Sequence, residues 1–123
     1  ILNKQNIYSN HMIFCFDLDN VICNTEGTDY SISVPHKEVI EKINSLYKNN
    51  NKILIFTARY MGRNNENVDM AIKQGFDSTE KQLKKWGVKY HKLIFGKPVY
   101  DVYVDDKNFE FKNNWITEFN KKY

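Results

Sequence analysis

The chain has 123 residues, a length suited to one domain with a single core. Its 41% apolar and 27% charged residues are typical of globular proteins and exclude a disordered or fibrous chain. The net charge of +3 is scattered, so nucleic acid is not an expected partner. The apolar runs are far shorter than the roughly 20 residues that span a bilayer, and no secretory signal is present. We therefore expect a cytoplasmic protein with no membrane partner.

Residues 1–11 are polar and show no periodicity, so we interpret them as a tail or leader and residues 12–123 as one domain. The two cysteines, Cys15 and Cys23, lie in or just after the first apolar run. They have neither CxxC spacing nor nearby histidine ligands, which argues against zinc and against a disulfide scaffold. We expect both thiols to be reduced and structural.

Short apolar runs alternate with amphipathic segments along the chain. Four of these runs are typical of buried parallel strands, namely Met12–Phe16, Lys52–Phe56, Lys92–Phe95 and Asp101–Asp105. A helix is expected between the first two, beginning near Pro35 and ending at "NNN". Two helices are expected between the second and third, one closed by Gly75 and one running to Gly87. This order predicts an α/β fold with a mostly parallel sheet covered on both faces.

Polar side chains follow each predicted strand, at the edge where such sheets bind ligands. They are Asp17, Asp19, Thr57, Arg59, Lys97, Asp105 and Asp106. Clustered carboxylates repel one another, and oxygen ligands without histidine or cysteine favour a hard divalent cation. We therefore expect a Mg²⁺ ion bound by the side chains of Asp17 and Asp105.

The spacing of Asp17 and Asp19 has a chemical reason. Residues i and i+2 of an extended segment point the same way, so both carboxylates can face one substrate. One can attack phosphorus to form an aspartyl phosphate while the other manages the protons. Lys97 and Thr57 can offset the charge that develops on the phosphoryl oxygens.

The segments "FDLDNV", "IFTAR", "GKP" and "DVYVDD", in this order, resemble the four motifs of the haloacid dehalogenase superfamily of phosphatases. The resemblance implies a Rossmann-like three-layer sandwich and a magnesium cofactor. It implies Asp17 as nucleophile and Asp19 as general acid/base, with the Asp19 backbone carbonyl on the metal. It also implies a set of supporting roles: phosphate contact for Thr57, phosphate neutralisation for Lys97, metal binding for Asp105 and support of the metal site for Asp106. Lys81 and Lys84 are alternatives to Lys97.

Within the superfamily, "DNVICNT", "GTDY" and "GKPVYDVYVDD" are similar to small phosphatases of bacterial capsule and surface-polysaccharide synthesis. This implies a small sugar, polyol or amino-alcohol phosphate as substrate. The chain leaves room for a short flap over Cys23–Val34 but for no cap domain. An open site would take its substrate contacts from the flap, from Arg59 and Arg63, or from a second subunit of a homo-oligomer that covers it.

Three alternatives compete with this interpretation. A receiver-like binding module would need an aspartate at the end of the strand before Thr57, and none is there. A phosphatase acting on the 3′ or 5′ ends of nucleic acids would be expected to carry a basic stripe interleaved with aromatic residues. A catalytically idle protein on the same fold would have no use for the clustered acids.

Overall fold

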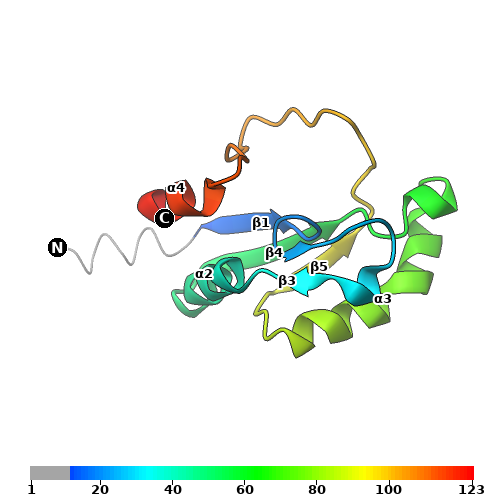
Figure 1. Ribbon diagram of the computed structural model, residues 1–123, viewed down its shortest axis with the longest axis horizontal. Helices are drawn as coiled ribbons and strands as arrows, with labels where there is room; N and C mark the ends of the chain where they lie inside the picture. The colour runs from blue at the N-terminus through cyan, green and yellow to red at the C-terminus, as the bar shows by residue number, and fades with distance from the viewer. Residues whose placement is uncertain (1–11) are drawn as a thin grey trace.

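The computed structural model describes residues 12–123, so the interpretation of residues 1–11 as a tail lies outside the described residues. Its regular elements, in chain order, are β1 (Ile13–Asp17), β2 (Cys23–Asn24), η1 (Tyr30–Ile32), β3 (Val34–Pro35), α2 (Lys37–Lys48), β4 (Lys52–Thr57), η2 (Gly62–Asn64), α3 (Val68–Lys85), β5 (Lys92–Phe95) and α4 (Trp115–Lys122). Figure 1 shows the order of these elements along the chain. None of the helices within residues 12–123 is long and apolar enough to cross a membrane.

The main sheet has the strand order β1-β4-β5, and both pairings are parallel. Phe14 stands opposite Ile53, and Ile55 stands opposite Leu93, so the buried side chains of the three strands share one face. A separate hairpin of β2 and β3 forms the base of the predicted short flap. The arrangement belongs to the Rossmann-like α/β class, as the sequence predicts.

Helix α2 confirms the helix predicted after Pro35. Its buried positions recur at three- and four-residue steps, which gives the helix one apolar side. These positions are Val39, Ile40, Ile43 and Leu46. The helix ends at the asparagine run, where Asn50 takes a left-handed conformation with φ of 69°. The side chain of Asn44 bonds the backbone of Gly87 and Lys89, which holds α2 beside the end of α3.

The prediction of two helices between β4 and β5 is wrong, because α3 is continuous through Gly75. Gly75 is buried in the middle of the helix, and a Cβ atom there would overlap the ring of Tyr60. The glycine therefore permits close packing instead of ending the helix. The end predicted at Gly87 is confirmed, since that residue follows the helix with φ of +73°.

We expect Gly75→Ala to destabilise the protein despite the better helix propensity of alanine. Alanine gains about 1 kcal/mol over glycine within a helix, but overpacking a filled site costs about 1–3 kcal/mol. The free energy of unfolding in urea should fall by about 1 kcal/mol. Gly62→Ala is the control, because a Cβ at Gly62 meets nothing within 4 Å. Equal stability of the two variants would contradict the packing role.

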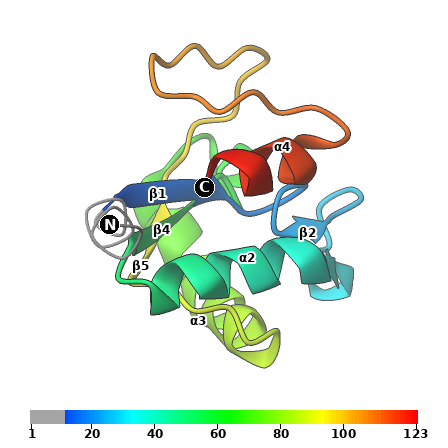
Figure 2. The same cartoon turned by 90° about the vertical axis from the view of Figure 1, so that its left-hand side faces the viewer.

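The prediction of helices on both faces of the sheet is wrong for the described part of the chain. Phe76 of α3 packs on Phe95, and Phe119 of α4 packs on Phe14, so both helices cover the face that carries these rings. Figure 2 shows α2 beside α4, next to β1 and β4, and the two helices are in contact. Right-handed crossovers that step in one direction across a sheet place their helices on the same side. On the opposite face Ile13 is 64% exposed.

The strand predicted over Asp101–Asp105 is also wrong, because this segment is exposed and forms no regular structure. Only five residues, 96–100, separate it from the end of β5. A crossover to another parallel strand needs about a dozen residues or more, so the segment cannot reach the free edge of β1 in its own chain. The alternating sequence has strand propensity, but the connection is too short.

Helix α4 was missed by the sequence analysis. Trp115, Ile116 and Phe119 are buried, and this i, i+1, i+4 spacing is the signal that could have revealed it. Phe119 makes edge contacts with Phe14 and Phe16, with ring centroids 5.8 Å apart in each case. The helix thus closes the core beside β1.

Candidate active site

Asp17 and Lys97 meet at the carboxyl edge of the sheet. Asp17 ends β1, and its Oδ1 accepts the backbone N–H of Leu18 at 2.8 Å. Lys97 follows β5, and its Nζ lies 3.2 Å from Asp17 Oδ2. The backbone N–H of Lys97 donates to the carbonyl of Thr57, which ties the end of β5 to the end of β4. The structure therefore brings together two residues that are far apart in the sequence.

The other two candidate lysines lie elsewhere. Lys81 and Lys84 are exposed on α3, whereas Lys97 is only 8% exposed. The rings of Tyr100 and Tyr103 lie 5.4 and 5.5 Å from the ammonium of Lys97. This environment favours Lys97 as the cation that neutralises an anion beside Asp17.

Burial raises the pKa of Asp17, and the charge and hydrogen bond of Lys97 oppose that rise only in part. For Lys97, burial alone would lower the pKa. The hydrogen bond to Tyr100 and the charge of Asp17 outweigh it, so the pKa of Lys97 is raised. The pair thus holds Lys97 as a cation, while Asp17 binds a proton more readily than an exposed aspartate.

We expect Lys97→Met to raise the pKa of Asp17 further in metal-free protein, because the opposing charge is lost. A carboxyl whose pKa is higher in the folded state loses stability as pH rises from its unfolded pKa through its folded pKa. The variant should therefore lose more stability across that window than the wild type. Carboxyl NMR titration of Asp17 measures the pKa, with Lys81→Met as control. A lower pKa in Lys97→Met would contradict the assignment.

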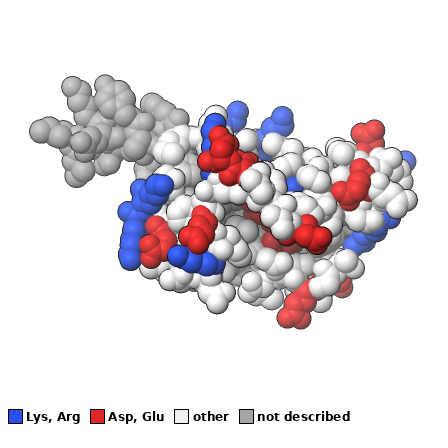
Figure 3. Space-filling view, turned by 90° about the horizontal axis from the view of Figure 1, so that it is seen from above, with Lys and Arg blue, Asp and Glu red and all other residues white. Residues whose placement is uncertain are grey.

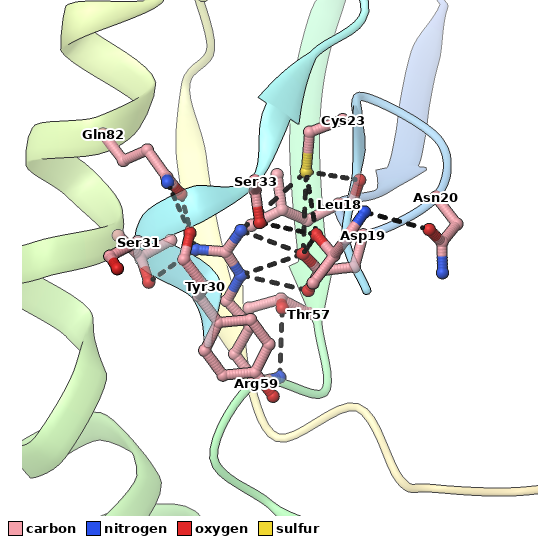
Figure 4. A network of polar contacts seen from close by, with 12 residues as sticks. Leu18, Asp19, Asn20, Cys23, Tyr30, Ser31, Ser33, Thr57, Arg59 and Gln82 are labelled. Atoms are coloured by element: carbon pink, nitrogen blue, oxygen red, sulfur yellow. Dashed lines mark hydrogen bonds and ion pairs between the residues drawn. The ribbon is translucent and has the colours of Figure 1, made fainter. Parts of the chain in front are cut away.

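Asp19 is held by Arg59, which follows β4. The Arg59 Nε lies 3.0 Å from Asp19 Oδ2, and its Nη2 lies 2.9 Å from Oδ1, so the contact is bidentate (Figure 4). From the flap, the hydroxyl of Thr25 donates a hydrogen bond of 2.6 Å to Asp19 Oδ1. Such a fork geometry fixes the carboxylate in both distance and plane. The general acid/base predicted at position 19 is thus oriented by two neighbours.

Arg59 itself is only 2% exposed, and its remaining donors are also engaged. Its Nη1 donates to Gln82 Oε1 at 2.7 Å, and its guanidinium carbon lies 4.6 Å from the ring centre of Tyr30. Gln82 Nε2 in turn donates to the carbonyl of Tyr30. The sequence predicts Arg59 as a substrate contact, but its burial and its contacts favour a residue that positions Asp19.

Thr57 occupies the end of the central strand and is fully buried. Its Oγ1 accepts the backbone N–H of Arg59 at 3.1 Å, so the hydroxyl shapes the turn that delivers Arg59 to Asp19. A direct contact between this hydroxyl and phosphate stays a prediction.

Arg63 lies on the rim of the site with aromatic neighbours. Its guanidinium carbon is 4.5 Å from the ring centre of Tyr60 and 5.5 Å from that of Tyr30. Its Nη2 donates to the carbonyl of Thr28 in the flap. Because Arg63 is exposed, it is better placed than Arg59 to meet a ligand from solvent.

The two carboxylates predicted to bind the metal, Asp17 and Asp105, lie in different surroundings. Asp105 is exposed, and it accepts the backbone N–H of Lys107 and the hydroxyl of Tyr103. The Lys107 bond is the main cause of the lowered pKa of Asp105. Residues 12–123 contain no group of three acidic, histidine or cysteine side chains that could hold a metal. Asp17 suits a hard cation, but the second carboxylate, Asp105, and its neighbour Asp106 lie in an exposed loop.

The flap and α3 provide contacts to Asp19 and Arg59 that the sequence does not predict. Thr25 touches Asp19 from the flap, while Tyr30 and Gln82 touch Arg59, which is distant from both in the sequence. His91, just before β5, accepts the backbone N–H of Ile53 and stacks on Tyr47.

Comparison with known proteins supports the fold alone. No family model matches the chain, and no curated protein matches it. The crystal structure of a target protein from Vibrio cholerae is similar, with a TM-score of 0.75 and 24% sequence identity. The match covers 90% of this chain and 98% of that one. The α/β architecture therefore recurs over nearly the full length of another protein.

Proposed function

We propose that this protein is a magnesium-dependent phosphomonoester hydrolase with Asp17 as its nucleophile. The observation that carries the proposal is the 3.2 Å contact between Asp17 and the buried Lys97 at the carboxyl edge of the sheet. A carboxylate beside a retained ammonium can receive a phosphoryl group whose negative charge the ammonium offsets. Asp19, two residues on, is held by Arg59 for proton transfer.

The reaction then has two steps. An oxygen of Asp17 bonds to phosphorus while the bond from phosphorus to the ester oxygen breaks, and Asp19 donates a proton to the departing alcohol. In the second step Asp19 accepts a proton from water, whose oxygen bonds to phosphorus and releases the Asp17 carboxylate. Lys97 remains charged through both steps. The bidentate contact with Arg59 holds Asp19 in place to exchange protons with the departing ester oxygen in the first step and with the attacking water in the second.

Magnesium, when bound, would draw charge from the phosphoryl oxygens. The residues that would hold it are Asp17, the backbone carbonyl of Asp19 and Asp105. In the described residues Asp105 lies in an exposed loop, outside any group of three acidic, histidine or cysteine side chains that could hold a metal.

The substrate we propose is a small sugar, polyol or amino-alcohol phosphate used in capsule or surface-polysaccharide synthesis. The support is the resemblance of the motifs and the surface around the site. Arg63 and Tyr60 form a polar and aromatic rim next to the flap, which suits a hydroxylated metabolite. In the view of Figure 3 acidic and basic side chains are interspersed, with no continuous basic track for a polynucleotide.

Removal of the metal tests the proposal. We expect phosphate release from p-nitrophenyl phosphate in Mg²⁺, at least about 100-fold slower after chelation and restored by added Mg²⁺. Calcium at equal concentration is the control, because its larger size and looser geometry suit phosphoryl transfer poorly. Undiminished hydrolysis in excess chelator would contradict the metal requirement.

A substrate screen tests the second half of the proposal. Sugar and alcohol phosphates are compared by kcat/KM with oligonucleotides carrying 3′ or 5′ phosphates. We expect the small metabolites to be preferred. A preference for oligonucleotide ends would instead support a nucleic-acid end phosphatase.

A further inference from the structure

The segment after Lys97 has the sequence of a strand but pairs with no strand among residues 12–123, and the rings of Tyr100 and Tyr103 lie near the ammonium of Lys97. Val102 is 78% exposed and Val104 is 91% exposed, while Tyr100 and Tyr103 are each more than a third exposed. β-branched and aromatic residues in alternation are typical of a strand that packs on one face. Figure 1 shows this stretch arching away from the sheet. The chain thus presents a strand-like segment to its surroundings.

The edge of β1 offers a place for such a strand. β1 pairs with β4 alone, so its other edge carries no hydrogen-bonded strand in the described residues. Phe14 and Phe16 on β1 are buried from one side by Phe119. A strand added to this edge would extend the same apolar face. Open edges of this kind pair readily with another chain.

The segment cannot fill this edge in its own chain. β5 lies at the far side of the sheet, with β4 between it and β1. The five residues 96–100 would have to cross the sheet and return to its opposite end, which takes about a dozen residues or more. The restriction applies to one chain only. A second copy can present its segment to the edge without that crossover.

We propose that the protein forms a dimer by strand exchange, in which Asp101–Asp105 of each copy pairs in parallel with β1 of the other. The pattern of side chains fixes the register. With Asp105 level with Asp17, Val104 and Val102 fall on the same face as Phe16 and Phe14. The valines then leave solvent and join the core beside α4.

This arrangement completes the site described above, and to that extent the inference rests on the proposed function. Asp105 of one copy reaches the carboxyl edge next to Asp17 of the other, and Asp106 follows it. One chain supplies the nucleophile, Lys97 and Asp19, and its partner supplies the second acidic ligand for a hard cation. The two acidic ligands are thereby brought together at the carboxyl edge, one from each chain.

Molar mass tests the assembly without any use of activity. Light scattering during gel filtration is expected to give twice the 14.7 kDa of one chain for the wild type. Val102→Asp combined with Val104→Asp should give a monomer with unchanged circular dichroism, because both side chains are exposed in the single chain. Ile32→Asp, at a residue 66% exposed on the flap, should remain a dimer. A monomeric wild type would overturn the inference.

Lengthening the connection separates strand exchange from any other dimer. Twelve glycine and serine residues inserted after Pro98 allow the segment to reach β1 of its own chain, so this variant should be a monomer that keeps phosphatase activity. A dimer with the mass of the wild type would show that the interface does not depend on the short connection, and would overturn the proposal.

Complementation tests the shared site. Chains with Asp17→Asn and with Asp105→Asn are co-expressed with different tags, and the doubly tagged dimer is purified. Strand exchange leaves one site with both mutations and one with neither, so about half of the wild-type activity is expected, while each homodimer is inactive. An inactive doubly tagged dimer from an active wild type would overturn the exchange but leave the proposed function standing. A dimeric wild type that releases no phosphate would overturn the function but leave the exchange standing.

Discussion

Asp17→Asn is expected to abolish phosphate release, with kcat lowered by at least about 10³-fold. The amide is nearly the same size as the carboxylate, and its oxygen can still accept the Leu18 N–H that Asp17 accepts at 2.8 Å. It cannot form the bond to phosphorus, however, because it lacks the negative charge and the leaving ability of the acid. Steady-state rates with p-nitrophenyl phosphate measure the loss.

Two companion variants sharpen this test. Asp77→Asn removes an exposed carboxylate on α3 and should leave kcat unchanged. Asp19→Asn keeps the nucleophile, so we expect slow turnover and accumulation of a phosphorylated chain, visible as an added mass of one phosphoryl group. Full activity in Asp17→Asn, with the fold intact by circular dichroism, would rule out the covalent mechanism.

Arg59→Met is expected to cost about 3 kcal/mol of unfolding free energy, because it leaves Asp19 without its buried charge partner. Arg59 is 2% exposed and also bonds Gln82 at 2.7 Å, so the change leaves the amide oxygen of the half-buried Gln82 without its donor. Asp19 keeps some access to solvent, which places the cost at the lower end for a broken buried pair. Urea unfolding measures the difference.

The exposed Arg63 provides a matched control on the same loop. Arg63→Met should change stability by less than about 0.5 kcal/mol. Arg59→Lys restores a charge but not the fork that meets both oxygens of Asp19. We expect Arg59→Lys to recover part of the stability while kcat stays low and KM stays near the wild-type value. Wild-type kcat in Arg59→Lys would contradict the role in positioning Asp19.

The elements that the sequence predicted well are those defined by local patterns. β1, β4 and β5 are short apolar runs between polar residues, and α2 has a clear apolar stripe. Gly75 was misinterpreted as a helix end because its role depends on the ring of Tyr60, which packs on α3 from the loop after β4. The segment Asp101–Asp105 has a strand pattern, but pairing depends on the length of the connection and on where the free edge lies.

The site residues that lie at the ends of strands could be predicted from the sequence, but the contacts between their side chains could not. Asp17 ends β1 and Lys97 comes just after β5, so parallel pairing alone places them at one edge. The contacts of Arg59 with Asp19, Gln82 and Tyr30 could not be deduced, since they depend on how the flap and α3 pack together. The position of Arg59 just after a strand therefore suggested a substrate contact, whereas its burial and its contact with Asp19 favour a residue that positions Asp19.

The order of strands across the sheet, β1-β4-β5, has a consequence for how the chain folds during synthesis. Each strand joins one that has already left the ribosome, so the sheet can grow in the order of translation without waiting for later residues. The segment Asp101–Asp105 emerges after the sheet is complete. Its pairing would be a bimolecular step, and its rate should therefore rise with protein concentration while the folding of the sheet does not.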